Sequence, residues 1–160
     1  PILYSDLWGD YWGYFSFTSG SLLTGRNQPN IGDYLARVNL VSLIPTFLLF
    51  YGFKESIKSF KNKNIDKLDI LDKYLVFAVL VSFFGYLWFL ISFPNNSGDT
   101  NKATYIIHLF HLLGLCSAIY IEKLKNINTK ISFSVLSILF FVFIHNLSSM
   151  MSHFPMITIF

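Results

Sequence analysis

Charged residues are scarce in this chain. Asp, Glu, Lys and Arg together make up 13% of its 160 residues, whereas a typical soluble domain has about 25%. Hydrophobic residues make up 53% of the chain, and its mean hydropathy is +0.50. A soluble domain of this length could not bury so much Phe, Leu and Ile in one core. The shortage of charge therefore excludes an ordinary water-soluble domain and indicates a protein that lies in a lipid bilayer.

Cysteine and the common catalytic motifs are also rare or missing. Cys116 is the single cysteine, so an intramolecular disulfide is impossible. The sequence contains no glycine-rich phosphate loop, no nucleophile elbow and no Cys/His spacing that is typical of a metal site. These absences exclude the soluble enzyme classes that such motifs mark.

The N-terminus carries no basic segment followed by an apolar run, so no signal peptide is indicated. Residue 1 is a proline, and the sequence ends in the apolar stretch MMSHFPMITIF. We therefore expect a single membrane domain over 1–160 that is a fragment of a longer polytopic protein, with the rest of the same polypeptide as a partner. Ten of the twelve cations are lysines, most of them between hydrophobic runs. Membrane topology explains that pattern, so no nucleic-acid partner is expected.

Four hydrophobic runs are long enough, or nearly so, to cross a bilayer, which takes about 20 helical residues. They cover residues 34–53, 74–93, 103–121 and 131–149. The first run contains Pro45, which membrane helices tolerate because neighbouring groups satisfy the freed carbonyl. The sequence thus predicts an all-α membrane protein with four transmembrane helices.

The lysines between these runs predict the orientation. Nine of the twelve cations fall in the segments 54–73 and 122–130, and the positive-inside rule places such segments in the cytoplasm. The arm 1–33, the loop 94–102 and the C-terminus then face outward and meet at one interface. We expect an integral membrane protein, in the plasma membrane of a prokaryote.

The arm contains an aromatic pattern within SDLWGDYWGYF. Trp8, Tyr11, Trp12 and Phe15 follow a spacing of i, i+3, i+4 and i+7, which a helix would align on one face. Trp and Tyr are frequent at membrane interfaces. The pattern predicts an outward-facing interfacial arm.

The same arm carries two acidic residues and two glycines, each pair four residues apart. Asp6 and Asp10 would share another face of the helix, while Gly9 and Gly13 would allow a neighbour to approach closely. Carboxylates suit a divalent cation such as Mg²⁺ or Mn²⁺, and also an amine or a nearby arginine. The residues alone leave these possibilities open, together with a plain aromatic belt.

Two cations lie at the predicted outer ends of helices. Lys102 precedes the third predicted helix with Tyr105 one turn later, and Arg37 lies in the first helix beside Asn39. Such cations commonly extend to lipid headgroups. They could equally contact a phosphate at the membrane surface.

Three histidines lie within the predicted membrane spans. His108 and His111 are three residues apart in the third helix, and His145 lies at a similar predicted depth in the fourth. Ionisable groups inside a membrane are candidates for function. Three imidazoles on two helices could bind haem or a transition metal, or could simply hydrogen-bond a neighbouring helix.

Several segments together resemble a known family. They are YSDLWGDYWGYF (4–15), YLARVNLVSLIPTFLLFYGF (34–53), and GYLWFLISFP with GDTNKATYIIHLFHLLGLCSAIYIEKL (within 85–124). This order resembles the C-terminal portion of the GT-C membrane glycosyltransferases of the protein-mannosyltransferase and aminoarabinose-transferase type, family 39. Such enzymes move a sugar from a polyprenyl-phosphate carrier to an acceptor on the non-cytoplasmic face.

The resemblance implies roles for residues at the outer face. Lys102 would lie near the carrier phosphate with Tyr105 beside it. Asp6 and Asp10 would face the outer cavity and bind sugar hydroxyls, a metal or an acceptor. The family's catalytic carboxylate lies in an outer loop that this chain does not contain, so no catalytic residue is expected here.

Trp8 and Trp12 could stack on a sugar or anchor the arm.

The chain departs from the family pattern at one place, and other functions remain open. Relatives often have proline in the third helix, where this chain has His108 and His111, so the resemblance gives the histidines no role. The alternatives are a haem- or metal-binding redox subunit that uses His108, His111 and His145, and a non-catalytic membrane subunit or transporter fragment.

Overall fold

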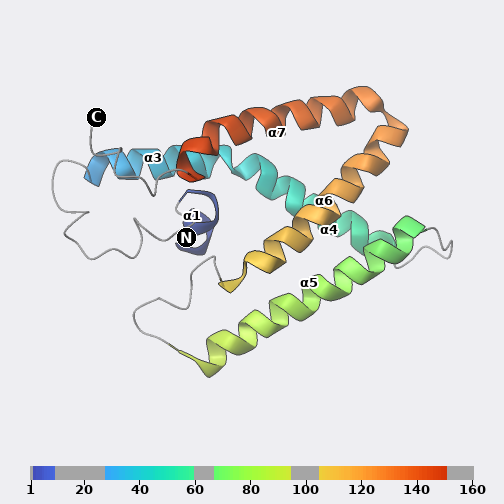
Figure 1. Ribbon diagram of the computed structural model, residues 1–160, viewed down its shortest axis with the longest axis horizontal. Helices are drawn as coiled ribbons and strands as arrows, with labels where there is room; N and C mark the ends of the chain where they lie inside the picture. Colours follow the sequence, from blue (N-terminus) through green and yellow to red (C-terminus); the bar gives the residue numbers. More distant parts are fainter. Residues whose placement is uncertain (1, 10–27, 60–66, 95–104, 151–160) are drawn as a thin grey trace.

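The computed structural model describes residues 2–9, 28–59, 67–94 and 105–150 (Figure 1). This described part is helical and contains no strand. Its helices are α1 (Ile2–Trp8), α3 (Gln28–Val41), α4 (Leu43–Lys58), α5 (Lys67–Ser92), α6 (Ile107–Ile127) and α7 (Thr129–Met150).

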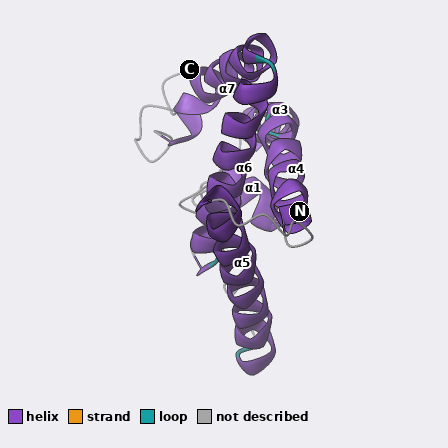
Figure 2. Ribbon diagram, turned by 90° about the vertical axis from the view of Figure 1, so that its right-hand side faces the viewer, coloured by secondary structure: helices purple, strands orange, loops and turns teal. Residues whose placement is uncertain are grey.

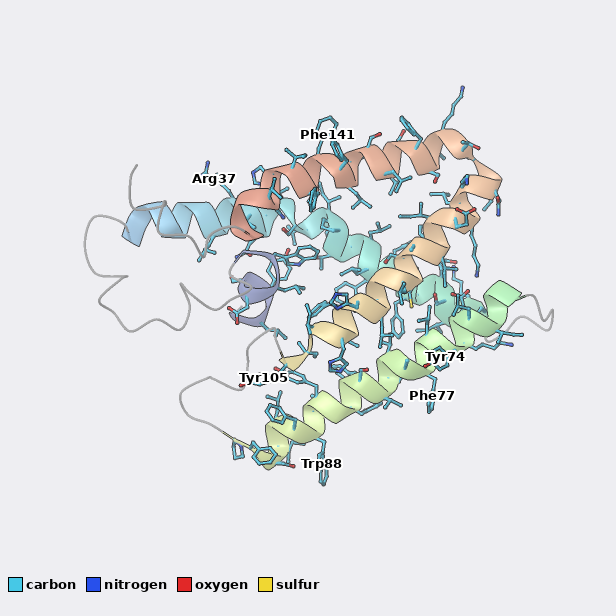
Figure 3. The ribbon with its side chains drawn as sticks, viewed as in Figure 1. Arg37, Tyr74, Phe77, Trp88, Tyr105 and Phe141 are labelled. Carbon is cyan, nitrogen blue, oxygen red and sulfur yellow. The ribbon has the colours of Figure 1, made fainter. Side chains whose placement is uncertain are left out.

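Four stretches are long and apolar enough to span a membrane, which confirms the predicted fold class. They cover Leu35–Lys58, Ile70–Ser92, Ile107–Ile127 and Thr129–Leu147. Only 17 to 22% of each span is buried inside the structure. Figure 3 shows Phe77, Trp88 and Phe141 directed away from the bundle. These apolar side chains need a surrounding bilayer, because no protein surface in the described ranges covers them.

The helices extend beyond the predicted runs at the Lys-rich end. The segment 122–130, which was predicted to be a loop, is helical except at Asn128. The Asn128 side-chain oxygen accepts hydrogen bonds from the backbone N–H groups of Lys130 (3.0 Å) and Ile131 (3.3 Å), and so caps the start of α7. Hydropathy predicts only the part of a helix that lies in the hydrocarbon layer. Lys and Glu are good helix formers, so the helices continue beyond that layer into water.

The helices α3 and α4 form one membrane span with a break at Ser42. Pro45 has no N–H group, so the carbonyl of Val41 loses its helical donor and the helix bends there. Ser42 is fully buried, and its hydroxyl oxygen accepts a hydrogen bond of 2.7 Å from the Asn146 amide. The far end of α7 is thereby fixed to this break.

The helix α6 lies at the centre of the bundle. Figure 2 shows α7 and α5 at opposite ends, with α4 and α6 between them, and α6 contacts all three. Its largest interface is with α4, where a Cβ atom added to Gly52 would lie 2.6 Å from the Cα atom of Ser117. The Ser117 hydroxyl also donates to the carbonyl of Leu48 at 3.1 Å. Small residues thus allow two backbones to approach closely.

A buried polar cluster joins α4, α5 and α6 at the Lys-rich end. The Asp72 side chain is 0% exposed, and it forms an ion pair with Lys123 of α6. Its other carboxylate oxygen accepts a hydrogen bond of 2.8 Å from the Ser56 hydroxyl of α4. The carboxylate of α5 therefore links α4 to α6.

Candidate binding groove

The described residues of the predicted outer face lie at one end of the bundle. The helix α1, the end of α5, the start of α6 and the end of α7 gather there (Figure 1). Lys102, Asp10 and Trp12 fall outside the described residues, so their predicted roles rest on the sequence.

The helix α1 is held against α3 by hydrogen bonds and by close packing. The Tyr4 hydroxyl donates to the carbonyl of Asn39 at 2.9 Å, and the Asn39 amide donates to the Ser5 hydroxyl at 2.7 Å. A Cβ atom on Gly9 would lie 2.9 Å from a methyl group of Leu35. Gly9 therefore has the role in close approach that its spacing predicted.

Asp6 is directed into the bundle. It is fully buried. The neighbouring Trp8 is half-buried, with its indole nitrogen shielded from solvent. Asp6 is therefore enclosed by protein instead of lining an open surface.

Next to Tyr86, a groove of about 440 Å³ runs between α5 and α6. Its lining residues come from α5, from the first turn of α6 and from the residues just before α6: Val81, Ser82, Gly85, Tyr86, Phe89, Tyr105 and His108. The Phe89 ring lies 5.4 Å from the Tyr105 ring and 6.4 Å from the Tyr86 ring, between centroids. A Cβ atom on Gly85 would meet nothing within 4 Å, so Gly85 leaves the groove open at its middle.

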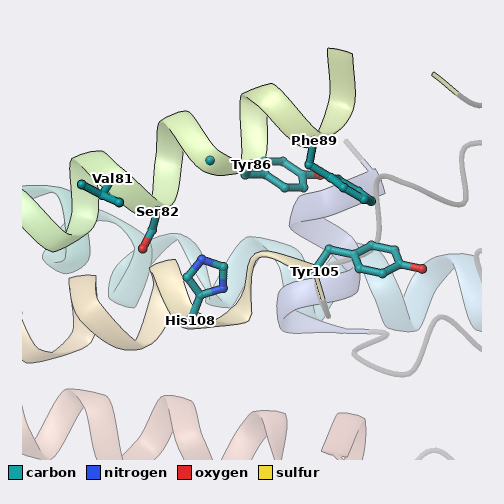
Figure 4. A pocket seen from close by; sticks show the side chains of 7 residues that line it. Val81, Ser82, Tyr86, Phe89, Tyr105 and His108 are labelled. Carbon is teal, nitrogen blue, oxygen red and sulfur yellow. The ribbon is translucent and has the colours of Figure 1, made fainter. Parts of the chain in front are cut away.

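The groove combines apolar walls with a few polar groups. Figure 4 shows the side chains of Ser82 and His108 directed into the space between α5 and α6, while the Tyr105 hydroxyl is directed away from them. Val81, Phe89 and the faces of the tyrosine rings make up the rest. Such a groove suits a long apolar chain that carries a polar group at one position.

Of the predicted outer cations, only Arg37 is described, and it lies away from the groove. Arg37 is exposed on α3 and is directed outward (Figure 3). Asn39, two residues later and therefore on the opposite helix face, contacts α1. The structure thus brings Tyr105 to the groove, whereas Arg37 stays apart from it.

The three membrane histidines have different surroundings. His108 lines the groove, the His111 ring donates to the carbonyl of Ile107 at 2.9 Å, and the His145 ring donates to the Asn146 side chain at 2.9 Å. Among the described residues, no three His, Cys, Asp or Glu side chains come together in a way that could hold a metal ion. Their arrangement gives no support to the metal-binding alternative.

The sequence did not single out the α5 wall of the groove. This wall belongs to a predicted span without charge, so a search for ionisable residues does not find it; its residues are Ser82, Gly85, Tyr86 and Phe89. Gly85 was the one available signal, because a glycine among large apolar residues marks either close packing or an open space.

Comparisons with protein-family models, with curated protein sequences and with solved structures each find no match to this chain.

Proposed function

We propose that the chain is part of a membrane glycosyltransferase that moves a sugar from a polyprenyl-phosphate carrier to an acceptor on the non-cytoplasmic face. The observation that carries the proposal is the groove between α5 and α6, with its aromatic lining and Tyr105 at its end. This is the same part of the chain, Lys102 to Tyr105, at which the family resemblance expects the carrier phosphate.

The groove fits the chemistry of such a carrier. An isoprenoid chain is long, apolar and unsaturated, and flat methyl-bearing units pack well against the Tyr86, Phe89 and Tyr105 rings. In a bilayer, however, lipid tails are as apolar as the groove, so burial alone gives little preference for one lipid. Selection must come from shape and from contacts to the phosphate, which Lys102 would supply at the outer end of α6.

Transfer of the sugar leaves negative charge on the carrier phosphate. A fixed cation beside that phosphate stabilises the departing group most when water is excluded. Asp6, which is fully buried, would stay inside the protein rather than meet an acceptor. Asp10, together with Trp8 and Trp12, would then bind the sugar, an acceptor or a divalent cation.

The proposed orientation follows from the lysines. The segments 54–73 and 122–130, which cover these helix ends and their connections and carry nine of the twelve cations, would face the cytoplasm of a prokaryotic cell. The groove and α1, at the other end of the bundle (Figure 1), would then face outward. Carrier-linked sugars would reach the groove from the outer leaflet.

Binding of undecaprenyl phosphate to the full-length protein in nanodiscs tests the proposal. Wild-type protein should bind it more tightly than phosphatidylglycerol, and Gly85→Leu should weaken binding about tenfold, because the new side chain fills the groove and excludes several isoprenoid contacts. Equilibrium competition with a tritiated carrier measures both values.

Gly114→Leu is the matched control, since a Cβ atom on Gly114 also meets nothing within 4 Å and Gly114 does not line the groove. This variant should bind as the wild type does. Equal losses in both variants, or no preference for the carrier over phosphatidylglycerol in the wild type, would contradict the proposed function.

A further inference from the structure

His108 differs from the other two membrane histidines in having no polar partner among the residues that the structure describes. The rings of His111 and His145 each donate a hydrogen bond within the bundle. His108 makes no hydrogen bond or ion pair with any residue that the structure describes, and its ring is directed into the groove (Figure 4). The ring is exposed there.

An imidazole in this position needs a polar partner. A ring N–H group within a membrane span that meets only hydrocarbon is strongly unfavourable. His108 lies three residues after Tyr105, which is about 4.5 Å along the axis of a helix. The ring is therefore near the end of the span, at a depth that the phosphate of a lipid can reach.

A second donor faces the same space from the other helix. The Ser82 hydroxyl of α5 is directed toward the region that His108 enters (Figure 4), and both residues line the groove. A hydroxyl and an imidazole N–H that converge from two helices suit a group with several acceptor oxygens. A phosphate has such oxygens, and its negative charge strengthens hydrogen bonds in a medium of low dielectric constant.

We propose that His108, with Ser82 opposite, hydrogen-bonds a phosphate oxygen of the lipid carrier and so distinguishes a phosphorylated isoprenoid from the free alcohol. This inference rests on the proposed function, and it gives a role to a residue for which the family resemblance provides none. His108 is a specificity residue: its imidazole holds the phosphate of the bound carrier at one place along the groove.

Binding of undecaprenyl phosphate and of undecaprenol to the full-length protein in nanodiscs tests this role. The wild type should prefer the phosphate. His108→Phe keeps a ring of similar size without a donor, and it should reduce that preference about tenfold to a hundredfold, the usual value of one hydrogen bond to a charged group. His108→Gln restores an N–H donor, and its preference should stay within about threefold of the wild type.

His111→Phe is the matched control, because it removes an imidazole one turn further along α6 whose donor is already used by Ile107. Its preference for the phosphate should equal that of the wild type. Full preference in His108→Phe would overturn this inference while leaving the proposed function intact, and so would an equal loss in His111→Phe. A wild type that binds undecaprenyl phosphate no better than phosphatidylglycerol would overturn both.

Discussion

Gly52→Ala is expected to destabilise the protein by about 2 to 3 kcal/mol, although alanine normally stabilises a helix relative to glycine by about 1 kcal/mol. The added Cβ atom would lie 2.6 Å from the Cα atom and 2.8 Å from the backbone nitrogen of Ser117. A neighbouring backbone cannot rotate away as a side chain can, so α4 and α6 must separate. Separation also weakens the hydrogen bond from Ser117 to Leu48.

Thermal unfolding, followed by fluorescence-detected size-exclusion chromatography, measures this effect. Gly85→Ala and Gly114→Ala are the controls, because a Cβ atom at either position meets nothing within 4 Å. Both should leave stability unchanged or raise it by up to about 1 kcal/mol. A neutral Gly52→Ala variant would mean that α4 and α6 do not cross at Ser117.

Lys123→Met should be the most harmful change at the Lys-rich end of the bundle, with a loss of about 3 to 5 kcal/mol. It removes the cation but leaves the Asp72 carboxylate, which is 0% exposed, with the Ser56 hydroxyl as its remaining described partner. The reverse change, Asp72→Asn, should cost less, because the Lys123 side chain is 34% exposed and can extend toward water.

A double-variant cycle checks the origin of this loss. Asp72→Leu combined with Lys123→Met should be more stable than Lys123→Met alone, since no buried charge then remains. Lys125→Met provides the comparison on the same helix. Its partner Glu122 is 3.6 Å away, both side chains are 56% exposed, and an exposed pair contributes about 0 to 1 kcal/mol. Equal losses for Lys123→Met and Lys125→Met would contradict a buried ion pair.

The four spans could be predicted because hydropathy reports the one property that every membrane helix shares. The ends of the helices could not be predicted in the same way. The chain stays helical to Lys58 and through 122–127. Charged residues there lie outside the hydrocarbon layer, but the helical backbone hydrogen bonds continue. At the third span the reverse happens: α6 begins at Ile107, after the predicted start at 103.

Tertiary contacts could not be predicted from the pattern of any single segment. Lys123 counted only as one of the cations of the segment 122–130, and Asp72 was not singled out, because nothing in their local sequence shows that they pair across 51 residues. The contact of Gly52 with Ser117 has a weak signal in the sequence, since Gly52 and Ser56 are small residues four apart and so lie on one face of α4. That signal indicates a packing face on α4 but does not show which helix packs against it.

The candidate site was predicted in part. Tyr105 was identified from the resemblance, and His108 from its chemistry, and both line the groove. The α5 wall was given no site role, although GYLWFLISFP belongs to the resembling segments, because aromatic residues in a charge-free span look the same whether they face lipid or a ligand. Arg37 was grouped with the outer site by depth alone, whereas its position on the helix directs it away from α1.

The crossing of α4 and α6 has a consequence for how the chain is made. Ser117 follows Gly52 by 65 residues, which takes the ribosome roughly 3 to 13 s at the usual rates of synthesis. Gly52 is therefore synthesised, and leaves the ribosome, before the Ser117 backbone against which it packs. Of α4, α5 and α6, the first helix to be made therefore has its largest interface with the last one.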